Sequence, residues 1–276
     1  MAEKELTESL IKHAWHTYLT TGNLPPEVNS PWYERKFFRP FFKRLPESPR
    51  CSICYIPFEG IGGNFSRIFL RVERSRLNPH LCNNCERFAT EFHGGTELEI
   101  SMLFVDVRGS TTIAENTSPE DFGKLIKKFY RTAAEVFYKN YGLVEKLVGD
   151  EVAGFFVPGF AGKAHAKAAL ETGKQIMAAL GYGTSSKPWI PAGMGINTGV
   201  AYVGSVHTEG DVSDIAILGD AVNTTARLTS QANPGEILIS DTTRQAANLD
   251  ITGMKSKTLK LKGKSQDIIA WTLSMA

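Results

Sequence analysis

Strand-like and helix-like apolar runs alternate along the latter part of this chain, from about residue 96 to its end. A buried strand is predicted at 98–107. A helix then opens at Ser118-Pro-Glu-Asp121, which supplies a serine N-cap, a proline in the first turn and an acidic residue three positions after the cap. Long helices between strands, with hairpins among them, predict an α/β (α+β) sandwich that contains a mixed sheet.

The remaining elements are predicted from the same signals. Strands are expected at 143–148 and 151–157, joined by a two-residue turn at Gly149-Asp150. Asn197-Thr-Gly199 is expected to separate two further strands. The other expected elements are strands at 190–196, 200–206 and 237–240, helices at 163–180 and 221–231, and a closing hairpin over 259–273.

The chain changes character near Phe92-His-Gly-Gly95. Residues 1–95 are rich in Pro, Arg, Phe and Cys, with one plausible helix at 4–21, so we expect an accessory region there and a catalytic-type domain at 96–276. Basic and aromatic residues interleave over 31–44, which could contact nucleic acid or a membrane surface. The preferred interpretation is that the rings pack on the neighbouring domain while the basic groups stay in solvent.

Net charge and the distribution of apolar residues disfavour a nucleic-acid-binding, a secreted or a membrane-spanning protein. A net charge of +2 disfavours an overall polyanion-binding surface, so nucleic acid is not an expected partner. The polar, acidic start of the chain does not resemble a signal peptide, and no uninterrupted apolar run reaches the roughly 18 residues of a membrane span. We therefore expect a cytoplasmic protein without a membrane span.

The four cysteines form two Cys-x2-Cys pairs, Cys51 with Cys54 and Cys82 with Cys85. In a chain without a secretion signal, this spacing favours metal ligation over disulfides. Four thiolates match a closed, tetrahedral Zn²⁺ site. An iron–sulfur or mononuclear iron centre and redox-active thiols are the alternatives.

Two aspartates end apolar, strand-like runs. Asp106 lies in Phe104-Val-Asp-Val-Arg-Gly-Ser-Thr111, and Asp150 lies in Glu145-Lys-Leu-Val-Gly-Asp-Glu151. Alone, Asp106 could cap a helix and Asp150 could be a turn residue, but together they supply hard oxygen ligands for Mg²⁺ or Mn²⁺ bound to phosphates. Backbone N–H groups and hydroxyls follow Asp106 near a helix start, where phosphate binds favourably. They belong to Gly109, Ser110 and Thr111.

Three other polar side chains accompany these motifs. Lys146 precedes Asp150 in the same hairpin, although a strand lysine alone is usually a solvated residue. Asn223 and Arg227 are four residues apart, so they project from the same face of the 221–231 helix. Beside a phosphate they could orient a ribose and stabilise developing charge; otherwise they form a surface hydrogen-bonding pair.

Taken in order, the motifs Phe-x-Asp-x-x-Gly-Ser-Thr, Glu-Lys-x-x-Gly-Asp and Gly-Asp-x-x-Asn-x-x-x-Arg resemble the class III nucleotidyl cyclases. The resemblance covers about residues 97–273 and implies a ferredoxin-like mixed sheet in a homodimer, with two active sites across the interface. Each site would convert a nucleoside triphosphate into a 3′,5′-cyclic monophosphate and pyrophosphate.

The resemblance also implies how the metal ions are held. Asp106 and Asp150 match the two metal-binding carboxylates, with the carbonyl of Val107 as an additional ligand. Two Mg²⁺ or Mn²⁺ ions would support in-line attack of the ribose 3′-hydroxyl on the α-phosphorus. In this family Lys146 and Asp150 of one chain serve opposite sites.

The other matching residues would bind the nucleotide. Lys146 would contact the purine and favour ATP, because a lysine donor suits adenine N1, whereas guanylyl cyclases usually place glutamate there. Asn223 would orient the ribose, and Arg227 would stabilise the transition state. Lys262 or Lys264 would contact the terminal phosphates, a choice that the sequence leaves open.

One position departs from the family pattern. The second purine-selecting residue, three before Gly219, is commonly Asp or Thr in adenylyl cyclases, but here it is Ala216. The hydrogen bond lost with it is worth roughly 0.5–1.5 kcal/mol, so ATP selectivity is weaker or depends on Ser213 or Asp214. We expect an adenylate cyclase with a signalling role, and a guanylate or mixed-specificity cyclase is the alternative.

Two rival functions are weighed against a cyclase. A catalytically weak nucleotide sensor, with a zinc-type nucleic-acid-binding or protein-binding module, is disfavoured because both metal aspartates are present. A diguanylate cyclase is disfavoured because its Gly-Gly-Asp/Glu-Glu-Phe signature is absent from the hairpin, where Val148-Gly-Asp-Glu-Val152 stands. The sequence does not indicate which partner or signal regulates the activity.

Overall fold

A computed structural model describes residues 7–25, 39–44, 49–51, 53–75, 81–185, 187–208, 212–259 and 267–275. The chain divides into two compact units. The first contains Met1–Leu98, Pro158–Phe160 and Tyr202–Leu218, and the second contains Glu99–Val157, Ala161–Ala201 and Gly219–Ala276. The domain boundary expected at residues 95 and 96 stays a prediction.

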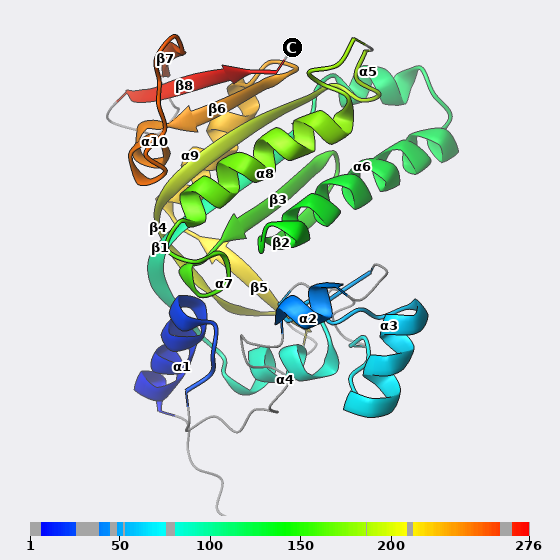
Figure 1. The fold of residues 1–276 in the computed structure, drawn as a ribbon, viewed down its shortest axis with the longest axis vertical. Coiled ribbons are helices and arrows are strands. Elements are labelled where there is room, and N and C mark those ends of the chain that lie inside the picture. The colour runs from blue at the N-terminus through cyan, green and yellow to red at the C-terminus, as the bar shows by residue number, and fades with distance from the viewer. Residues whose placement is uncertain are drawn as a thin grey trace, which may run out of the picture. The chain divides into compact units, whose positions relative to one another are not determined.

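The strands form one mixed sheet, as the sequence predicts, and most of them belong to the second unit (Figure 1). The strands are β1 (Gly95–Val107), β2 (Leu143–Val148), β3 (Glu151–Phe156), β4 (Ala192–Thr208), β5 (Val212–Leu218), β6 (Glu236–Ser240), β7 (Lys255–Leu259) and β8 (Ile268–Ser274). Their order is β2-β3-β1-β4-β6-β8-β7, and β5 pairs with β4. β4 and β6 are parallel, whereas β3 pairs antiparallel with both β1 and β2, and β8 with both β6 and β7.

The helices are α1 (Glu8–Thr21), α2 (Arg39–Arg44), α3 (Gly60–Phe65), the π-helix η3 (Ser66–Leu70), α4 (Asn83–Glu91), α5 (Ser110–Glu115), α6 (Pro119–Lys139), α7 (Pro158–Ala161), α8 (His165–Leu180), α9 (Asp220–Gln231) and α10 (Asp241–Ala246). Ser118 caps α6 as predicted, because its Oγ accepts from the Asp121 N–H at 3.1 Å. None of the described helices has the length and apolar character that a membrane span requires.

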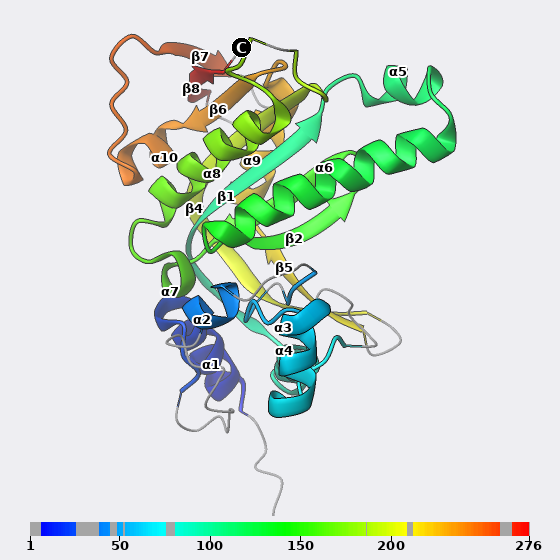
Figure 2. The same cartoon turned by 45° about the vertical axis from the view of Figure 1, so that its right-hand side comes forward.

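Burial is nearly continuous along β3 and β6, as expected where helices cover both faces of a sheet (Figures 1 and 2). α6 and α8 lie across one face, where Phe129 and Phe137 belong to the same buried cluster as Ile237 and Ile239 of β6. α9 covers the opposite face, where Leu238, the residue between those two isoleucines, packs against the helix. Every residue of β6 after Glu236 is buried, and successive side chains of a strand point to opposite faces, so this one strand supports both layers.

The expected break at Asn197-Thr-Gly199 is wrong, because β4 continues through it as one strand. Both polar side chains are buried and hydrogen-bonded inside the second unit. Asn197 Nδ2 donates to the Ala221 carbonyl at 2.9 Å, and Thr198 Oγ1 lies 2.7 Å from Ser101 Oγ. The polar side chains of Asn197 and Thr198, which led to the prediction of a turn, therefore find their hydrogen-bond partners in residues distant in the sequence. The strand β5, which pairs with the end of β4, is not among the expected elements.

In the first unit, α1 packs against α4 and the segment that follows it. Trp15 Nε1 donates to the Phe92 carbonyl at 2.8 Å, and the Trp15 ring lies 5.0 Å from the Phe88 ring. The basic and aromatic segment at 31–44 is described only over α2, where Phe42 is buried and Phe41 is 49% exposed. The remainder of that segment lies outside the described residues.

Candidate functional site

The structure brings Asp106 and Asp150 together. Asp106 lies at the end of β1, opposite Glu151, the first residue of β3. Asp150 immediately precedes Glu151 in the β2–β3 turn, where Gly149 adopts a φ of +63°. The Val107 N–H donates to the Asp150 carbonyl at 3.1 Å and holds the turn against the end of β1. Two motifs that the sequence places far apart therefore form one site.

Carboxylates are concentrated at this position. Burial raises the pKa of Asp106, and the neighbouring Asp150 adds to the rise while Arg108 opposes it. Burial also raises the pKa of Glu151, which faces both aspartates. Three acidic groups with one arginine leave an excess of negative charge, which a divalent cation would neutralise.

The segment after β1 lies beside Asp150. Ser110 donates a hydrogen bond from its hydroxyl to the Asp150 carboxylate. Gly109 has a φ of +69° at the start of α5, and a side chain added there would meet open space. The first N–H groups of a helix have no partner within it, so those of Ser110 and Thr111 are available at this end of α5.

Arg108 links the carboxylate of Asp106 to α9. Its Nη2 atom lies 2.9 Å from Asp106 Oδ2 and donates to the Thr229 carbonyl at 2.6 Å, near the C-terminal end of α9. Its Nε atom is buried without a hydrogen-bond partner in the described part of the chain. Sequence reasoning gave no role to this residue, because its partners are distant in the chain.

α9 presents Asn223 and Arg227 on its outer side. Asn223 is exposed and Arg227 is half-buried. The helix lies close to β4, since a Cβ added at Gly195 would be 2.4 Å from the Thr229 nitrogen. Within the described residues, neither Asn223 nor Arg227 forms a hydrogen bond or ion pair with Asp106 or Asp150. One chain therefore holds the carboxylates but does not join them to the α9 pair.

The other predicted nucleotide contacts are only partly described. Lys146 lies in β2 opposite Ala153, next to a register shift that marks a bulge, but its side-chain placement is outside the description. Ala216 lies in β5 opposite Gly204. Lys262 and Lys264 lie outside the described residues.

The four cysteines converge in the first unit, as their spacing predicts. All four sulfurs lie within 4.8 Å of one another, and all four residues are buried. Two backbone N–H groups point at sulfur: that of Cys82 lies 3.3 Å from Cys51 Sγ, and that of Cys85 lies 3.4 Å from Cys82 Sγ. Burial raises the pKa of the Cys54 thiol well above its ordinary value, a cost that a bound cation offsets by stabilising thiolate.

These distances fit one metal ion. A tetrahedral ion with four metal–sulfur bonds of about 2.3 Å places its sulfurs about 3.8 Å apart. The Cys54 and Cys82 sulfurs are 3.7 Å apart. A cluster with several iron atoms puts metal and sulfide between the thiolates and spreads them farther, so the iron–sulfur cluster alternative fits this geometry less well.

Comparison with known proteins identifies the part of the chain that follows the first 94 residues. The family model for the adenylate and guanylate cyclase catalytic domain matches residues 95–275. The chain belongs to this family. Its curated relatives include an uncharacterized protein of Mycobacterium tuberculosis, 27% identical over 179 residues, which cover 63% of this chain and 32% of that protein. The chain thus spans about a third of the length of the curated relatives it matches.

Solved cyclases have the same fold. The guanylyl cyclase Cya2 is 28% identical with a TM-score of 0.60, over 66% of this chain and 100% of that chain. The adenylyl cyclase CyaB from P. aeruginosa is 26% identical with a TM-score of 0.55, over 65% of this chain and 96% of that chain. Class III cyclases of both specificities are therefore similar to this protein, and the likeness does not decide between ATP and GTP.

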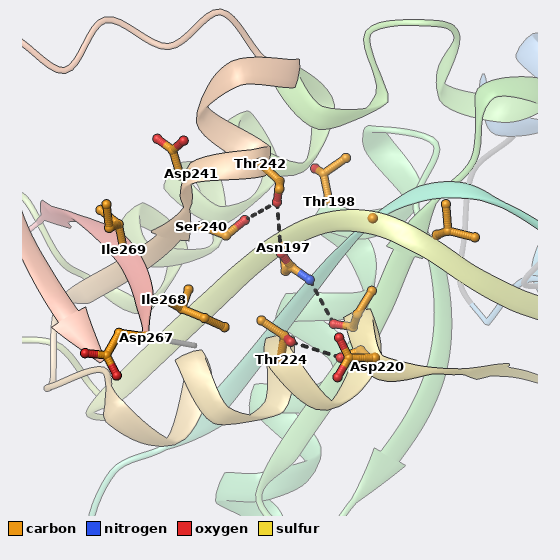
Figure 3. Close-up of a pocket in the computed structure, with 13 residues that line it drawn as sticks. Asn197, Thr198, Asp220, Thr224, Ser240, Asp241, Thr242, Asp267, Ile268 and Ile269 are labelled. Atoms are coloured by element: carbon orange, nitrogen blue, oxygen red, sulfur yellow. Dashed lines mark hydrogen bonds between the residues drawn. The ribbon is translucent and has the colours of Figure 1, made fainter. Parts of the chain in front are cut away.

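A cavity of about 480 Å³ lies beside α9 in the cyclase domain (Figure 3). Three carboxylates line it, from Asp220, Asp241 and Asp267, and no basic side chain does so among the described residues. A hydrogen bond from Arg244 lowers the pKa of Asp241 to about 2, so this carboxylate stays ionised. The described lining of the cavity is therefore acidic, which disfavours a triphosphate against these residues.

Sequence reasoning also missed a buried polar network beside this cavity. His165 Nδ1 lies 2.9 Å from Ser101 Oγ, which contacts Thr198, and Thr198 Oγ1 lies 3.0 Å from Thr243 Oγ1. Burial lowers the pKa of His165. The network joins β1, β4, α8 and α10 of the cyclase domain, and no sequence spacing indicates it.

Proposed function

We propose that this protein is an adenylate cyclase that converts ATP into 3′,5′-cyclic AMP and pyrophosphate. One observation carries the proposal: in a chain of the cyclase family, Asp106 and Asp150 are adjacent and lie beside the start of α5. A sensor that had lost its activity would have no need to keep both carboxylates in this arrangement.

The reaction forms one phosphorus–oxygen bond and breaks another. The ribose 3′-oxygen attacks the α-phosphorus, its proton passes to solvent, and the bond from the α-phosphorus to the β-phosphate oxygen breaks. Asp106 and Asp150, with the Val107 carbonyl, would hold two Mg²⁺ or Mn²⁺ ions, which when bound acidify the 3′-hydroxyl and neutralise the pyrophosphate. The carboxylate oxygens fit these hard cations.

The remaining residues would position the nucleotide. The N–H groups and hydroxyls at the start of α5 would contact the phosphates, and Lys262 or Lys264 would contact the terminal ones. Asn223 would hydrogen-bond to the ribose, and Arg227 would stabilise negative charge on the transferring phosphoryl group. The phosphate-contacting positions in α5 are Gly109, Ser110 and Thr111.

We infer a homodimer with the active sites at its interface. Support comes from α9, where Asn223 is exposed and Arg227 is half-buried, and where neither is bonded to Asp106 or Asp150 within the described part of the chain. Exposed apolar residues offer surface to a second copy: Val148, beside the β2–β3 turn, is 65% exposed, and Val200 is 60% exposed. Each protomer would then supply the part that the other lacks.

Lys146 supports ATP as the substrate, and Ala216 weakens that preference. An ammonium group donates to adenine N1 but is mispaired with the N1–H of guanine. Alanine gives the adenine amino group no acceptor. A cyclase that accepts both ATP and GTP is therefore the second candidate.

For the accessory region, proposed at residues 1–95, we infer a structural Zn²⁺ ion held by Cys51, Cys54, Cys82 and Cys85. Four buried sulfurs with no open position match a closed site. A single iron ion in the same tetrahedron is the alternative, and elemental analysis of the purified protein separates the two.

Product analysis tests the activity. Purified protein is incubated with ATP or GTP and Mn²⁺ or Mg²⁺, and the product is identified by mass spectrometry. We expect cyclic AMP from the native chain and none from Asp106→Asn, whereas Asp121→Asn, which changes an exposed carboxylate on α6, keeps full activity. Cyclic nucleotide formed by Asp106→Asn at the native rate would contradict the metal assignment. Lys146→Glu should shift the product ratio toward cyclic GMP.

A further inference from the structure

The helical segment formed by α3 and η3, in the first unit, carries large apolar side chains on its outside. Three of them are strongly exposed: Ile61 at 76%, Ile68 at 67% and Phe69 at 72%. The buried positions are occupied by small residues, namely Gly62, Gly63 and Ser66. An ordinary surface helix does the reverse, because it buries its large apolar residues and exposes polar ones.

Close packing explains the small residues on the inner side. A Cβ at Gly63 would lie 2.4 Å from the Phe58 carbonyl carbon, so the helix backbone rests directly on the preceding segment. This contact leaves no room for a large inner side chain. It does not require isoleucine or phenylalanine on the outer side, where a polar residue would be better solvated. Contiguous exposed apolar surface is typical of an interaction site.

Aromatic contacts extend this surface to α2. The Phe65 ring lies 5.1 Å from the Phe69 ring and 6.3 Å from that of Phe41, which is itself 49% exposed. We call Phe41, Ile61, Phe65, Ile68 and Phe69 the α3 patch. It lies on α2, α3 and η3, which belong to the first unit; α2 and α3 are labelled in Figure 2.

Arginines predominate among the charged residues around the α3 patch. Arg67 directly precedes Ile68 and donates to Asn64 Oδ1 at 2.9 Å, and Arg71 directly follows η3. Among the side chains that the structure describes in α2, in the helical segment and in its flanks, the exposed charged ones are Arg44, Arg67, Arg71 and Arg74, with Glu59 and Glu73. An apolar helix face bordered by arginines is typical of a helix that lies in the interface of an anionic membrane.

We propose that the α3 patch docks on a membrane surface that contains anionic lipid. Anionic headgroups would neutralise Arg67 and Arg71, while the phenylalanine and isoleucine side chains enter the boundary of the acyl chains. A second copy of the chain is a poorer occupant, because two facing patches would bring like-charged arginines into one interface. The proposal requires no membrane-spanning helix and does not depend on cyclase activity.

Vesicle co-sedimentation tests the proposal with the full chain. Phosphatidylcholine vesicles are compared with vesicles in which about a third of the lipid is phosphatidylglycerol, at low and high salt. We expect binding to the anionic vesicles that weakens as salt rises. Arg67→Gln/Arg71→Gln should reduce the partition coefficient about fivefold for each arginine. Ile68→Ser/Phe69→Ser should reduce it by about tenfold or more.

Matched controls come from the second unit. Lys127→Gln/Arg131→Gln removes two exposed basic residues of α6, and Ile269→Ser removes an apolar side chain that is 50% exposed. Both should bind vesicles as the native chain does. The proposal is wrong if the native chain ignores anionic vesicles, if neutral vesicles bind it equally well, or if both patch variants bind undiminished. It is also wrong if the patch variants dissociate an oligomer of the vesicle-free protein, because a second copy would then cover the patch.

Discussion

Replacing Arg108 with glutamine should destabilise the fold. Its Nη2 atom lies 2.9 Å from Asp106 Oδ2 and donates to the Thr229 carbonyl at 2.6 Å. A hydrogen bond from a charged donor contributes about 1.5–3 kcal/mol, and a partly exposed ion pair adds up to about 1 kcal/mol. The substitution also removes the Nε atom, which is buried without a hydrogen-bond partner among the described residues and therefore destabilises the native protein; its removal offsets part of the loss. We expect a net loss of about 2 kcal/mol in the free energy of unfolding.

Metal affinity should change in the opposite direction. The guanidinium occupies a carboxylate oxygen of Asp106 and repels a cation bound there. At a separation of about 5 Å in a water-like dielectric, charges of +1 and +2 repel by about 1.7 kcal/mol, so Arg108→Gln should bind Mn²⁺ roughly 20-fold more tightly. Arg108→Lys keeps the charge but loses the planar fork, so it should lose stability without gaining Mn²⁺ affinity.

Two measurements on each variant separate these effects. Urea unfolding reports the free energy of unfolding. Calorimetric titration with Mn²⁺, near pH 8 so that Asp106 is ionised despite its raised pKa, reports the affinity. Arg131→Gln, which removes an exposed arginine of α6, is the control and should change neither quantity. A glutamine variant that is as stable as the native chain, or that binds Mn²⁺ no more tightly, would refute the reasoning.

Three further changes test other parts of the structure. Gly195→Ala should lower the free energy of unfolding by about 1–3 kcal/mol, because the added Cβ would lie 2.4 Å from the Thr229 nitrogen. Gly123→Ala, whose Cβ meets open space within α6, should raise it by about 0.5–1 kcal/mol, and urea unfolding compares the two variants. Burial lowers the pKa of His165, so between its folded pKa and the ordinary value of about 6.5 the unfolded chain binds the extra proton. The contribution of neutral His165 to the free energy of unfolding should therefore be fully present above about pH 6.5, and below that pH it should fall by up to about 1.4 kcal/mol per pH unit. In unfolding curves measured from about pH 5 to 7, His165→Gln should remove this slope. Cys54→Ser should lower bound zinc well below about one ion per chain in elemental analysis, and an unchanged zinc content would argue against the tetrahedral site.

Local signals predicted much of the cyclase domain from the sequence. The serine cap of α6, the Gly149-Asp150 turn and the strands on either side of it lie where the sequence places them. These features depend on residues a few positions apart, such as Ser118 and Asp121, which are joined by a hydrogen bond within the first turn of one helix. The cysteine spacing likewise predicted a cluster, because two Cys-x2-Cys turns present paired sulfurs.

Contacts between distant residues decided the rest. Asn197 and Thr198 resemble a turn in sequence, yet they lie within β4 because Ala221 and Ser101 satisfy them. The bonds of Arg108 to both Asp106 and Thr229, and the outward isoleucines and phenylalanines of α3 and η3, have no sequence signal of their own. Helix caps, turns and apolar periodicity are short-range and can be derived from the chain alone. Which side chains are buried, and which groups they hydrogen-bond to, depends on which segments of the chain come into contact, and only the tertiary structure determines that.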